Sequence, residues 1–297
     1  MNASSQTTRP LDHLVLPVSD LATARSRYEA LGFTVAPRGE HPFGTENACV
    51  FFKGGTFLEP LAVADREVAE REARAGNVFV GRDQAYRFRR GQDGFSAIVM
   101  GSEDADRDDA AFAEAGLSAG RMLSFSRKFK TPAGEEGEAA FKLSFAADPR
   151  APDAYFFTCQ RINVPAVDRT ALESHANGVV GMREIIAVEE NPSDFQYLLQ
   201  EIAGTRDIDA HSFGISADAA NARLSILTPA GLEAYFGAKV EGRERGIHLT
   251  AIIFTVADLS ACQAHIARSG IATRTSGNRL IVDRAAGQGA IFIFEEA

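Results

Sequence analysis

The chain has 297 residues, with 31 Lys and Arg against 40 Asp and Glu, a formal net charge of −9, and 45% hydrophobic residues. These values are typical of a folded globular protein and exclude a disordered or collagen-like chain. The acidic balance argues against nucleic acid or an anionic membrane as a partner, because phosphate binding needs a clustered positive surface. A small-molecule ligand is therefore the expected partner, and a homo-oligomer is left open.

The sequence carries no sign of export or membrane insertion. The first ten residues are polar and lack the apolar stretch of a secretion signal. The longest apolar runs, such as Ala251 to Val256, are far below the roughly 20 residues needed to cross a bilayer. The cysteines, Cys49, Cys159 and Cys262, form no CxxC pair, which fits a reducing compartment. We expect a cytoplasmic protein.

A repeated interval of twelve residues between an aspartate and a glycine predicts four related units. An apolar segment precedes each aspartate, which predicts a strand followed by a helix N-cap. The glycine predicts the left-handed turn that ends the helix. Three copies have this spacing, and a fainter fourth begins at an asparagine: Asp20 and Gly32, Asp104 and Gly116, Asp258 and Gly270, and Asn191 and Gly204.

The first unit shows the full order of elements. A strand over Leu11 to Val18 precedes the first helix, and β-branched and aromatic residues after the helix predict three more strands. Each unit is therefore predicted to be βαβββ. The three later strands are expected at Phe33 to Ala36, Ala48 to Phe52 and Thr56 to Leu61.

A charged segment and an insert distinguish the middle of the chain. Arg66 to Arg74 predicts a solvated helix with intrahelical charge pairs. The second unit starts with a strand over Phe95 to Met100, and its insert, Phe125 to Gly137, predicts a strand pair joined by a polar turn. The arginines between these segments are either an anion site or, as we favour, a solvated charge run: Arg82, Arg87, Arg89 and Arg90.

The second half repeats the order of the first. First strands are predicted over Arg183 to Val188 and Leu249 to Val256. The last unit adds strands over Ala272 to Thr275, Arg279 to Asp283 and Ala290 to Glu295. The linker between the halves is expected over Asn163 to Ser174.

A single βαβββ unit cannot bury both its helix and its sheet face, so the units are expected to pair. The predicted fold is α+β, with four modules paired into two cup-shaped mixed β-sheets and the helices outside. Two domains are expected, over residues 1–162 for the first two modules and 175–297 for the last two. Pairing in chain order and pairing across the termini are both open. The second would gather Glu295 and His248 around the first unit, although an odd offset turns His248 to the opposite face.

Paired βαβββ units resemble the vicinal oxygen chelate superfamily, which includes glyoxalases, extradiol dioxygenases and bleomycin-binding resistance proteins. Three runs in the first unit resemble more narrowly the glyoxalase-like domain family: Leu11 to Val15, His41 to Asn47 and Phe57 to Glu59. Weaker similarities lie at Phe156 to Gln160 and His175 to Gly178.

The resemblance implies a metal site in the first cup. In the superfamily the metal is held by side chains of the first and fourth strands, and these positions correspond to His13 and Glu59. A divalent Zn, Fe, Mn or Ni ion held there would polarise neighbouring oxygens of a small oxygenated substrate, as in a lyase, isomerase or dioxygenase. Glu59 would be a ligand or the catalytic base. A structural role for His13 is the alternative.

Further polar residues of the resembling runs are candidate substrate contacts. His41, Thr45 and Asn47 would line the mouth of the cup, or else form a tight turn between strands. His175 and Asn177 would contact the substrate from the second half, or close a turn.

The second unit contributes no imidazole at either ligand position. Arg161 stands where relatives often carry a histidine. This departure favours the alternative function, a metal-free small-molecule binding or resistance protein. The co-occurrence of His13 and Glu59 favours the metal-assisted enzyme, which we place first.

Overall fold

The structure is a computed structural model and describes residues 8–130, 136–163, 168–240 and 244–297. Most of the polar N-terminal segment, the turn of the insert at 131–135, and residues 164–167 of the expected linker lie outside the described residues.

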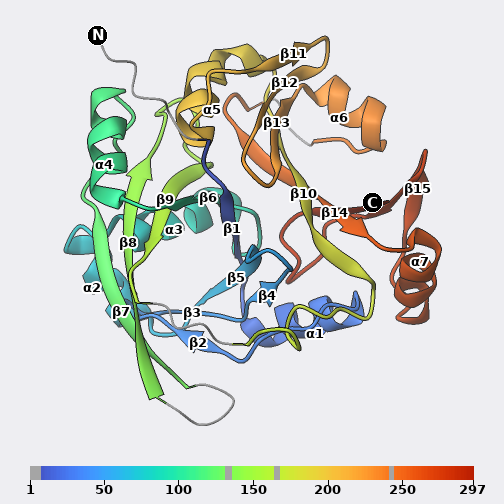
Figure 1. The fold of residues 1–297 in the computed structure, drawn as a ribbon, viewed down its shortest axis with the longest axis horizontal. Helices are drawn as coiled ribbons and strands as arrows, with labels where there is room; N and C mark the ends of the chain where they lie inside the picture. Colours follow the sequence, from blue (N-terminus) through green and yellow to red (C-terminus); the bar gives the residue numbers. More distant parts are fainter. Residues whose placement is uncertain (1–7, 131–135, 164–167, 241–243) are drawn as a thin grey trace.

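The first two units form one nine-stranded mixed sheet (Figure 1). Its order is β2-β3-β5-β1-β6-β9-β8-β7, with β4 paired to β5. The predicted strand pair of the insert is confirmed, because β7 and β8 are antiparallel partners. The strands are β1 (Leu11–Pro17), β2 (Gly39–Glu40), β3 (Thr45–Asn47), β4 (Val50–Phe51), β5 (Phe57–Val63), β6 (Ala97–Ser102), β7 (Leu123–Lys130), β8 (Glu136–Ala146) and β9 (Tyr155–Arg161).

The last two units form an eight-stranded sheet with the same plan, in the order β11-β12-β13-β10-β14-β17-β16-β15. In both sheets the first strand of each unit lies parallel to its last strand, and the two first strands meet antiparallel at the centre. The strands are β10 (Val179–Val188), β11 (Asp209–His211), β12 (Gly214–Asp218), β13 (Arg223–Leu227), β14 (His248–Val256), β15 (Arg274–Ser276), β16 (Arg279–Val282) and β17 (Ile291–Glu296).

The fold class is therefore confirmed, and the units pair in chain order. Pairing across the termini is wrong, because β1 adds β6 and β10 adds β14 as antiparallel partners. The division into two separate domains stays a prediction.

The helix starts follow the repeated aspartates. Asp20, Asp104 and Asp258 each accept a hydrogen bond from a backbone N–H three residues on, as N-caps do. The fainter copy differs: Asn191 makes no cap bond, because its amide contacts Ser193 and Asp194 instead, and the 3₁₀ helix η1 (Pro192–Phe195) comes first. The α-helices are α1 (Leu21–Ala30), α2 (Arg66–Arg74), α3 (Val78–Arg90), α4 (Ala105–Glu114), α5 (Gln196–Ala203), α6 (Pro229–Phe236) and α7 (Leu259–Arg268). Within the described ranges, none of the helices has the length and apolar character of a membrane span.

The helices of the four units and the helices of the connecting segments cover different faces of the sheets. Buried residues of α1, α4, α5 and α7 belong to one large core between the halves. The helices α2 and α3 pack instead on the face of the first sheet that carries Val15, Leu61 and Phe157, which we call the inner face. In the second half α6 fills the corresponding place through Leu232 and Phe236.

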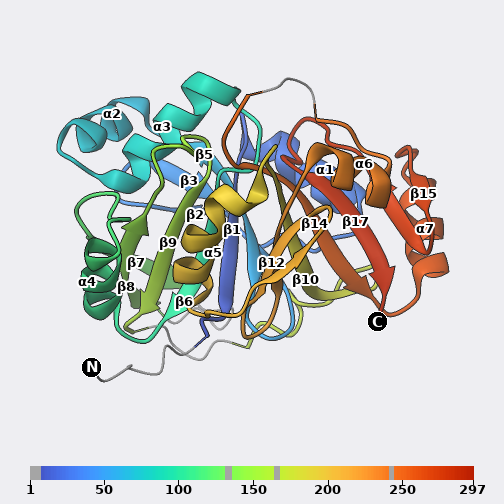
Figure 2. The ribbon, with the colours of Figure 1, turned by 90° about the horizontal axis from the view of Figure 1, so that it is seen from above.

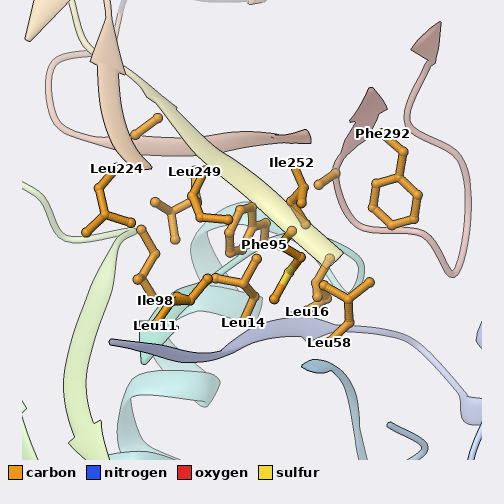
Figure 3. Packing of buried hydrophobic residues seen from close by; sticks show 14 of the residues in the cluster. Leu11, Leu14, Leu16, Leu58, Phe95, Ile98, Leu224, Leu249, Ile252 and Phe292 are labelled. Carbon is orange, nitrogen blue, oxygen red and sulfur yellow. The ribbon is translucent and has the colours of Figure 1, made fainter. Parts of the chain in front are cut away.

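The two halves share the large core. Leu14 and Ile98 of the first sheet lie in one cluster with Leu249 and Ile252 of the second (Figure 3). Figure 2 shows the halves side by side, with α1 beside the second sheet. Phe33, at the end of α1, packs against Phe254 with ring centroids 5.4 Å apart. Burial of this apolar surface is the main force holding the halves together.

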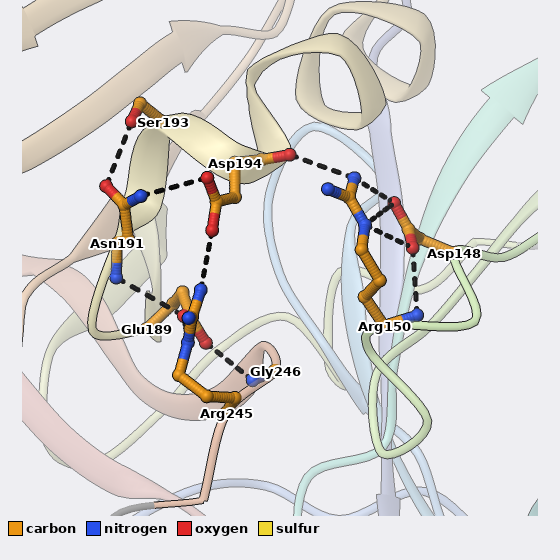
Figure 4. A network of polar contacts seen from close by, with 8 residues as sticks. All are labelled: Asp148, Arg150, Glu189, Asn191, Ser193, Asp194, Arg245 and Gly246. Carbon is orange, nitrogen blue, oxygen red and sulfur yellow. Dashed lines mark hydrogen bonds and ion pairs between the residues drawn. The ribbon is translucent and has the colours of Figure 1, made fainter.

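A polar network adds to this contact at the surface (Figure 4). Arg150 of the first half is ion-paired to Asp148 and donates to the backbone carbonyl of Asp194 in the second half. Arg245 joins the same Asp194 to Glu189, whose carboxylate is buried.

One predicted strand, Phe33 to Ala36, is wrong. The guanidinium of Arg25 donates to the carbonyl oxygens of Val35 and Ala36, which a strand would need for its own ladder. The segment forms no strand, although the backbone N–H of Ala36 donates to the carbonyl oxygen of Cys49 at 2.8 Å, and the short β2 forms later.

Candidate functional site

His13 and Glu59 lie on neighbouring strands and face the same side of the first sheet. In the parallel pairing of β1 with β5, His13 is opposite Phe57, and Val15 is opposite Glu59. Alternation along each strand places both side chains on the inner face. Their closest polar atoms, Nε2 of His13 and Oε2 of Glu59, are 3.5 Å apart, and both residues are buried.

The run His41 to Asn47 brings a second imidazole and an amide to the same carboxylate. Nδ1 of His41 lies 2.9 Å from the hydroxyl of Thr45, which orients the ring. Nδ2 of Asn47 donates to Oε1 of Glu59 at 2.6 Å and lies 3.4 Å from Nε2 of His41. Nε2 of His41 is itself 3.6 Å from Oε1 of Glu59. Glu59 is thus held between the two imidazoles.

Gly44 makes this turn possible. Its φ of +85° is a backbone conformation that residues with a Cβ rarely adopt. A Cβ there would lie 2.6 Å from the backbone oxygen of Asp65 and 2.8 Å from the backbone nitrogen of Ala69. The glycine lets the turn pack closely against the start of α2, and this packing fixes the position of His41.

A chain of alternating charges leads from the edge of the site to its centre. Arg161 is ion-paired to Asp12 at 2.8 Å, and the other oxygen of Asp12 lies 2.6 Å from Nδ1 of His13. Burial alone would lower the pKa of His13, but its hydrogen bonds to Asp12 and Glu59 outweigh this and raise it. Both ring nitrogens face carboxylate oxygens, which only accept hydrogen bonds, and on this geometry we assign His13 as an imidazolium.

Glu59 and His41 have strongly shifted pKa values. Burial alone would raise the pKa of Glu59, yet the hydrogen bond and charge of His13, with His41 and Asn47, lower it to about 2. Burial lowers the pKa of His41 to about 4. At neutral pH the site therefore holds a carboxylate and an uncharged imidazole. With Nδ1–H donating to Thr45, Nε2 of His41 is free to accept the Asn47 amide.

A mostly aromatic cavity of about 70 Å³ opens in front of these groups. His13 stacks on Phe57 with ring centroids 4.4 Å apart, and His41 stacks on Phe43 at 5.0 Å. The cavity thus combines an apolar wall with one polar corner, as small-molecule sites do. The phenylalanines that line it are Phe43, Phe51, Phe57, Phe79, Phe125, Phe141 and Phe157.

The side chains of the site do not fit a resident divalent metal as they are arranged. Within the described part of the chain, no group of three or more His, Cys, Asp or Glu side chains is placed to hold a metal ion. Besides His13 and Glu59, the nearest donor is Nε2 of His41, but the Asn47 amide faces this nitrogen and also occupies one oxygen of Glu59. Cys49 and Cys159 also line the cavity, and burial raises the pKa of both thiols, so both are protonated in the metal-free protein.

The other predicted substrate contacts lie elsewhere. Thr45 is buried behind His41 and does not line the cavity. His175 accepts from the backbone N–H of Thr34 and contacts the carbonyl oxygen of Phe51 at 3.0 Å. Asn177 bonds the backbone of Leu31 and of Val179. His175 and Asn177 therefore tie the second half to the first unit, and their polar groups are not directed at the cavity.

The second sheet offers no equivalent site in its described residues, because α6 fills its inner face. Glu295 is ion-paired to Arg183 and Arg279, and His248 contacts the carbonyl oxygen of Glu244. A site shared between the first and fourth units is therefore wrong.

The sequence matches the family model described as a glyoxalase-like domain over residues 11–203, which is more than half of the chain. The chain belongs to the glyoxalase-like domain family. This family and the structural neighbours below place the protein in the vicinal oxygen chelate superfamily. A search of curated proteins finds no match.

Solved structures share the fold of this glyoxalase-like protein at low sequence identity. A hypothetical protein from Staphylococcus aureus has a TM-score of 0.66 and 14% identity, covering 97% of this chain and 100% of its own. A mutant of 4-hydroxymandelate synthase from Streptomyces coelicolor has a TM-score of 0.57 and 11% identity, covering 97% and 92%. The Mn(II)-bound glyoxalase from Novosphingobium aromaticivorans has a TM-score of 0.53 and 13% identity, covering 98% and 83%.

Sequence reasoning missed several residues of the site in this glyoxalase-like protein. Asp12 is part of the resembling run, but only the structure gives it a role as the partner of His13. Phe57 lies two residues before Glu59 on β5, and Phe157 lies on β9. Because side chains alternate between the two faces of a strand, this spacing could have placed both phenylalanines on the inner face. No sequence signal brings Arg127 or Arg169 to the cavity, because both come from segments far from β1 and β5.

Proposed function

We propose that this protein binds a small oxygenated organic molecule with an aromatic or similarly flat apolar body in the cavity of its first sheet, without a resident metal. The observation that carries the proposal is a phenylalanine-lined cavity with one buried carboxylate, Glu59, in its polar corner. Ring faces favour a flat apolar body. The carboxylate favours a hydroxyl or other hydrogen-bond donor on that body.

The electrostatics of the corner favour binding. A carboxylate with a pKa of about 2 is ionised at any physiological pH and accepts hydrogen bonds strongly. It is held in place by His13 and Asn47, so it needs little rearrangement when a ligand arrives. Such preorganisation improves affinity.

The metal-assisted reaction that the sequence suggested is not part of this proposal. His13 and Glu59 do lie together, as that prediction required. However, the imidazolium of His13 balances the charge of Glu59, and Asn47 donates a hydrogen bond to the same carboxylate, so Glu59 needs no metal cation as a counter-ion.

Phenol provides a direct test. We expect it to bind EDTA-treated protein, measured by calorimetry, and to bind Glu59→Gln about tenfold or more weakly, because a hydrogen bond to a charged group contributes roughly 1.5–3 kcal/mol. Glu46→Gln is the matched control: Glu46 lies on β3, the strand paired with β5, is ion-paired to Arg38 and does not line the cavity. Binding that appears only after a stoichiometric Mn, Fe, Zn or Ni ion is added would contradict the proposal.

Proton transfer is a second candidate function, and the adjacency of His13 and Glu59 favours it. His13 offers a proton donor and Glu59 an acceptor 3.5 Å away, both lining the cavity. This is the arrangement for moving a proton next to a carbonyl, as a lyase or isomerase does. The low pKa of Glu59 makes it a weak base, so binding remains the first candidate.

Deuterium exchange separates the two candidates. If the pair transfers protons, the methyl group of acetophenone exchanges with D₂O faster with the wild-type protein than with His13→Gln, as followed by proton NMR. Equal exchange rates with both proteins would contradict proton transfer by the pair, and ligand binding would remain the proposed function.

A further inference from the structure

Three arginines line the same cavity, and none of them comes from the elements that carry His13 and Glu59. Arg127 lies on β7, Arg161 ends β9, and Arg169 follows in the segment between the halves. All three are partly buried. Each guanidinium lies over a phenylalanine ring of the cavity wall, which fixes its position. The pairs are Arg127 over Phe141 at 5.7 Å, Arg161 over Phe57 at 5.7 Å and Arg169 over Phe51 at 4.5 Å.

Within the part of the chain that the structure describes, one of the three arginines has an ion-pair partner. Arg161 is ion-paired to Asp12. Among the residues that the structure describes, no carboxylate lies within ion-pair distance of Arg127 or Arg169. Within the described ranges, Arg127 and Arg169 therefore line the cavity without an ion-paired carboxylate, in a chain whose formal net charge is −9.

The charges are close enough to affect one another. Burial lowers the pKa of Arg169, the charges of Arg161 and Arg127 lower it further, and the charge of Glu173 offsets only part of this shift. Holding such charges together costs free energy, which an anion between them would recover.

We infer that Arg127 and Arg169 bind the oxyanion of an organic acid whose apolar body occupies the phenylalanine-lined cavity. This inference rests on the proposed function and names the class of ligand. A planar guanidinium matches a carboxylate or a phosphate through paired N–H donors. Glu59 and the arginines then contact different polar groups of one molecule, so a hydroxy acid satisfies both.

The test compares three probes that share a phenyl ring: benzoate, its neutral analogue benzamide, and phenyl phosphate. We expect benzoate or phenyl phosphate to bind the full-length protein at least tenfold more tightly than benzamide by calorimetry. The tighter of the two anions identifies the oxyanion as carboxylate or phosphate. Loss of one charged hydrogen-bond donor in Arg127→Gln or Arg169→Gln should weaken that anion about tenfold or more and leave benzamide unchanged.

Arg66→Gln is the control, because Arg66 is exposed on α2 and does not line the cavity. It should bind all three probes as the wild type does. Benzamide binding as tightly as both anions, or anion binding unchanged in Arg127→Gln and Arg169→Gln, would overturn the inference and leave the proposed function standing. If neither the three probes nor phenol binds, both fail.

Discussion

Replacing Phe254 with alanine is expected to lower the free energy of unfolding by roughly 3–5 kcal/mol, as for other fully buried phenylalanines. Phe254 is completely buried on β14, in the second half of the chain. Its ring lies 5.4 Å from that of Phe33 and 5.7 Å from that of Phe52, both in the first half. The cavity left by the ring would therefore open in the core that the halves share.

We expect both halves to lose stability together in this variant, because they are joined by one core. Calorimetry should show a single transition at lower temperature. Cys49 in the first half and Cys262 in the second are both buried free thiols, so pulsed thiol labelling reports on each half separately. Both should become more reactive to the same extent. Phe88→Ala is the control, since its ring is 93% exposed and its loss should change stability by at most about 0.5 kcal/mol. Reactivity that rises at Cys262 alone would show that the halves unfold separately.

The repeat, and through it most of the fold, could be predicted from the sequence. A strand, a capping aspartate, a helix and a glycine are local features, and each has a local physical cause. The prediction is wrong where other groups decide the outcome. The guanidinium of Arg25 donates hydrogen bonds to the backbone carbonyls of Val35 and Ala36, which a strand would use for its ladder. Asn191 contacts Ser193 and Asp194 instead of capping a helix.

The site was predictable in part for the same reason. His13 and Glu59 follow from strand position and alternation. The arginine run in α3 is predicted to be solvated, yet Arg87 is buried, pairs with Asp83 and donates to the backbone carbonyls of Val18 and Leu61. The arginines that line the cavity are elsewhere, because the insert and the segment between the halves are brought to the cup by tertiary structure.

Acidification from pH 6.5 to about 4.5 is expected to destabilise the protein through His41. Its pKa is about 4 in the folded state, against the ordinary histidine value of 6.5 in the unfolded chain. Above pH 6.5 the imidazole is neutral in both states and contributes nothing to the pH dependence. As the pH falls below 6.5, His41 becomes protonated in the unfolded chain but stays neutral in the folded protein. The free energy of unfolding therefore decreases until the pH reaches about 4. The full loss is roughly 3 kcal/mol.

The neighbouring groups act in other pH windows. His13 has a raised pKa, so its contribution is complete below pH 6.5 and is lost only as the pH rises through its folded value. Glu59 has a pKa lowered from 4.5 to about 2, so its contribution is present above pH 4.5 and is lost below it. Between pH 6.5 and 4.5, His41 is therefore the group of this cluster that makes the free energy of unfolding depend on pH.

Urea unfolding of wild type and His41→Gln at half-unit intervals of pH measures the slope of this dependence. The variant should lose the part of the slope that His41 supplies, because glutamine takes up no proton. His211→Gln, on the exposed strand β11, should keep the wild-type slope. A wild-type slope in His41→Gln would mean that His41 is protonated inside the fold. The imidazole would then donate to Glu59 rather than accept the Asn47 amide, and the polar corner would hold two cations around one carboxylate. Such a corner would itself attract the oxyanion that we assign to Arg127 and Arg169, so this titration also tests how the two ends of the ligand are arranged.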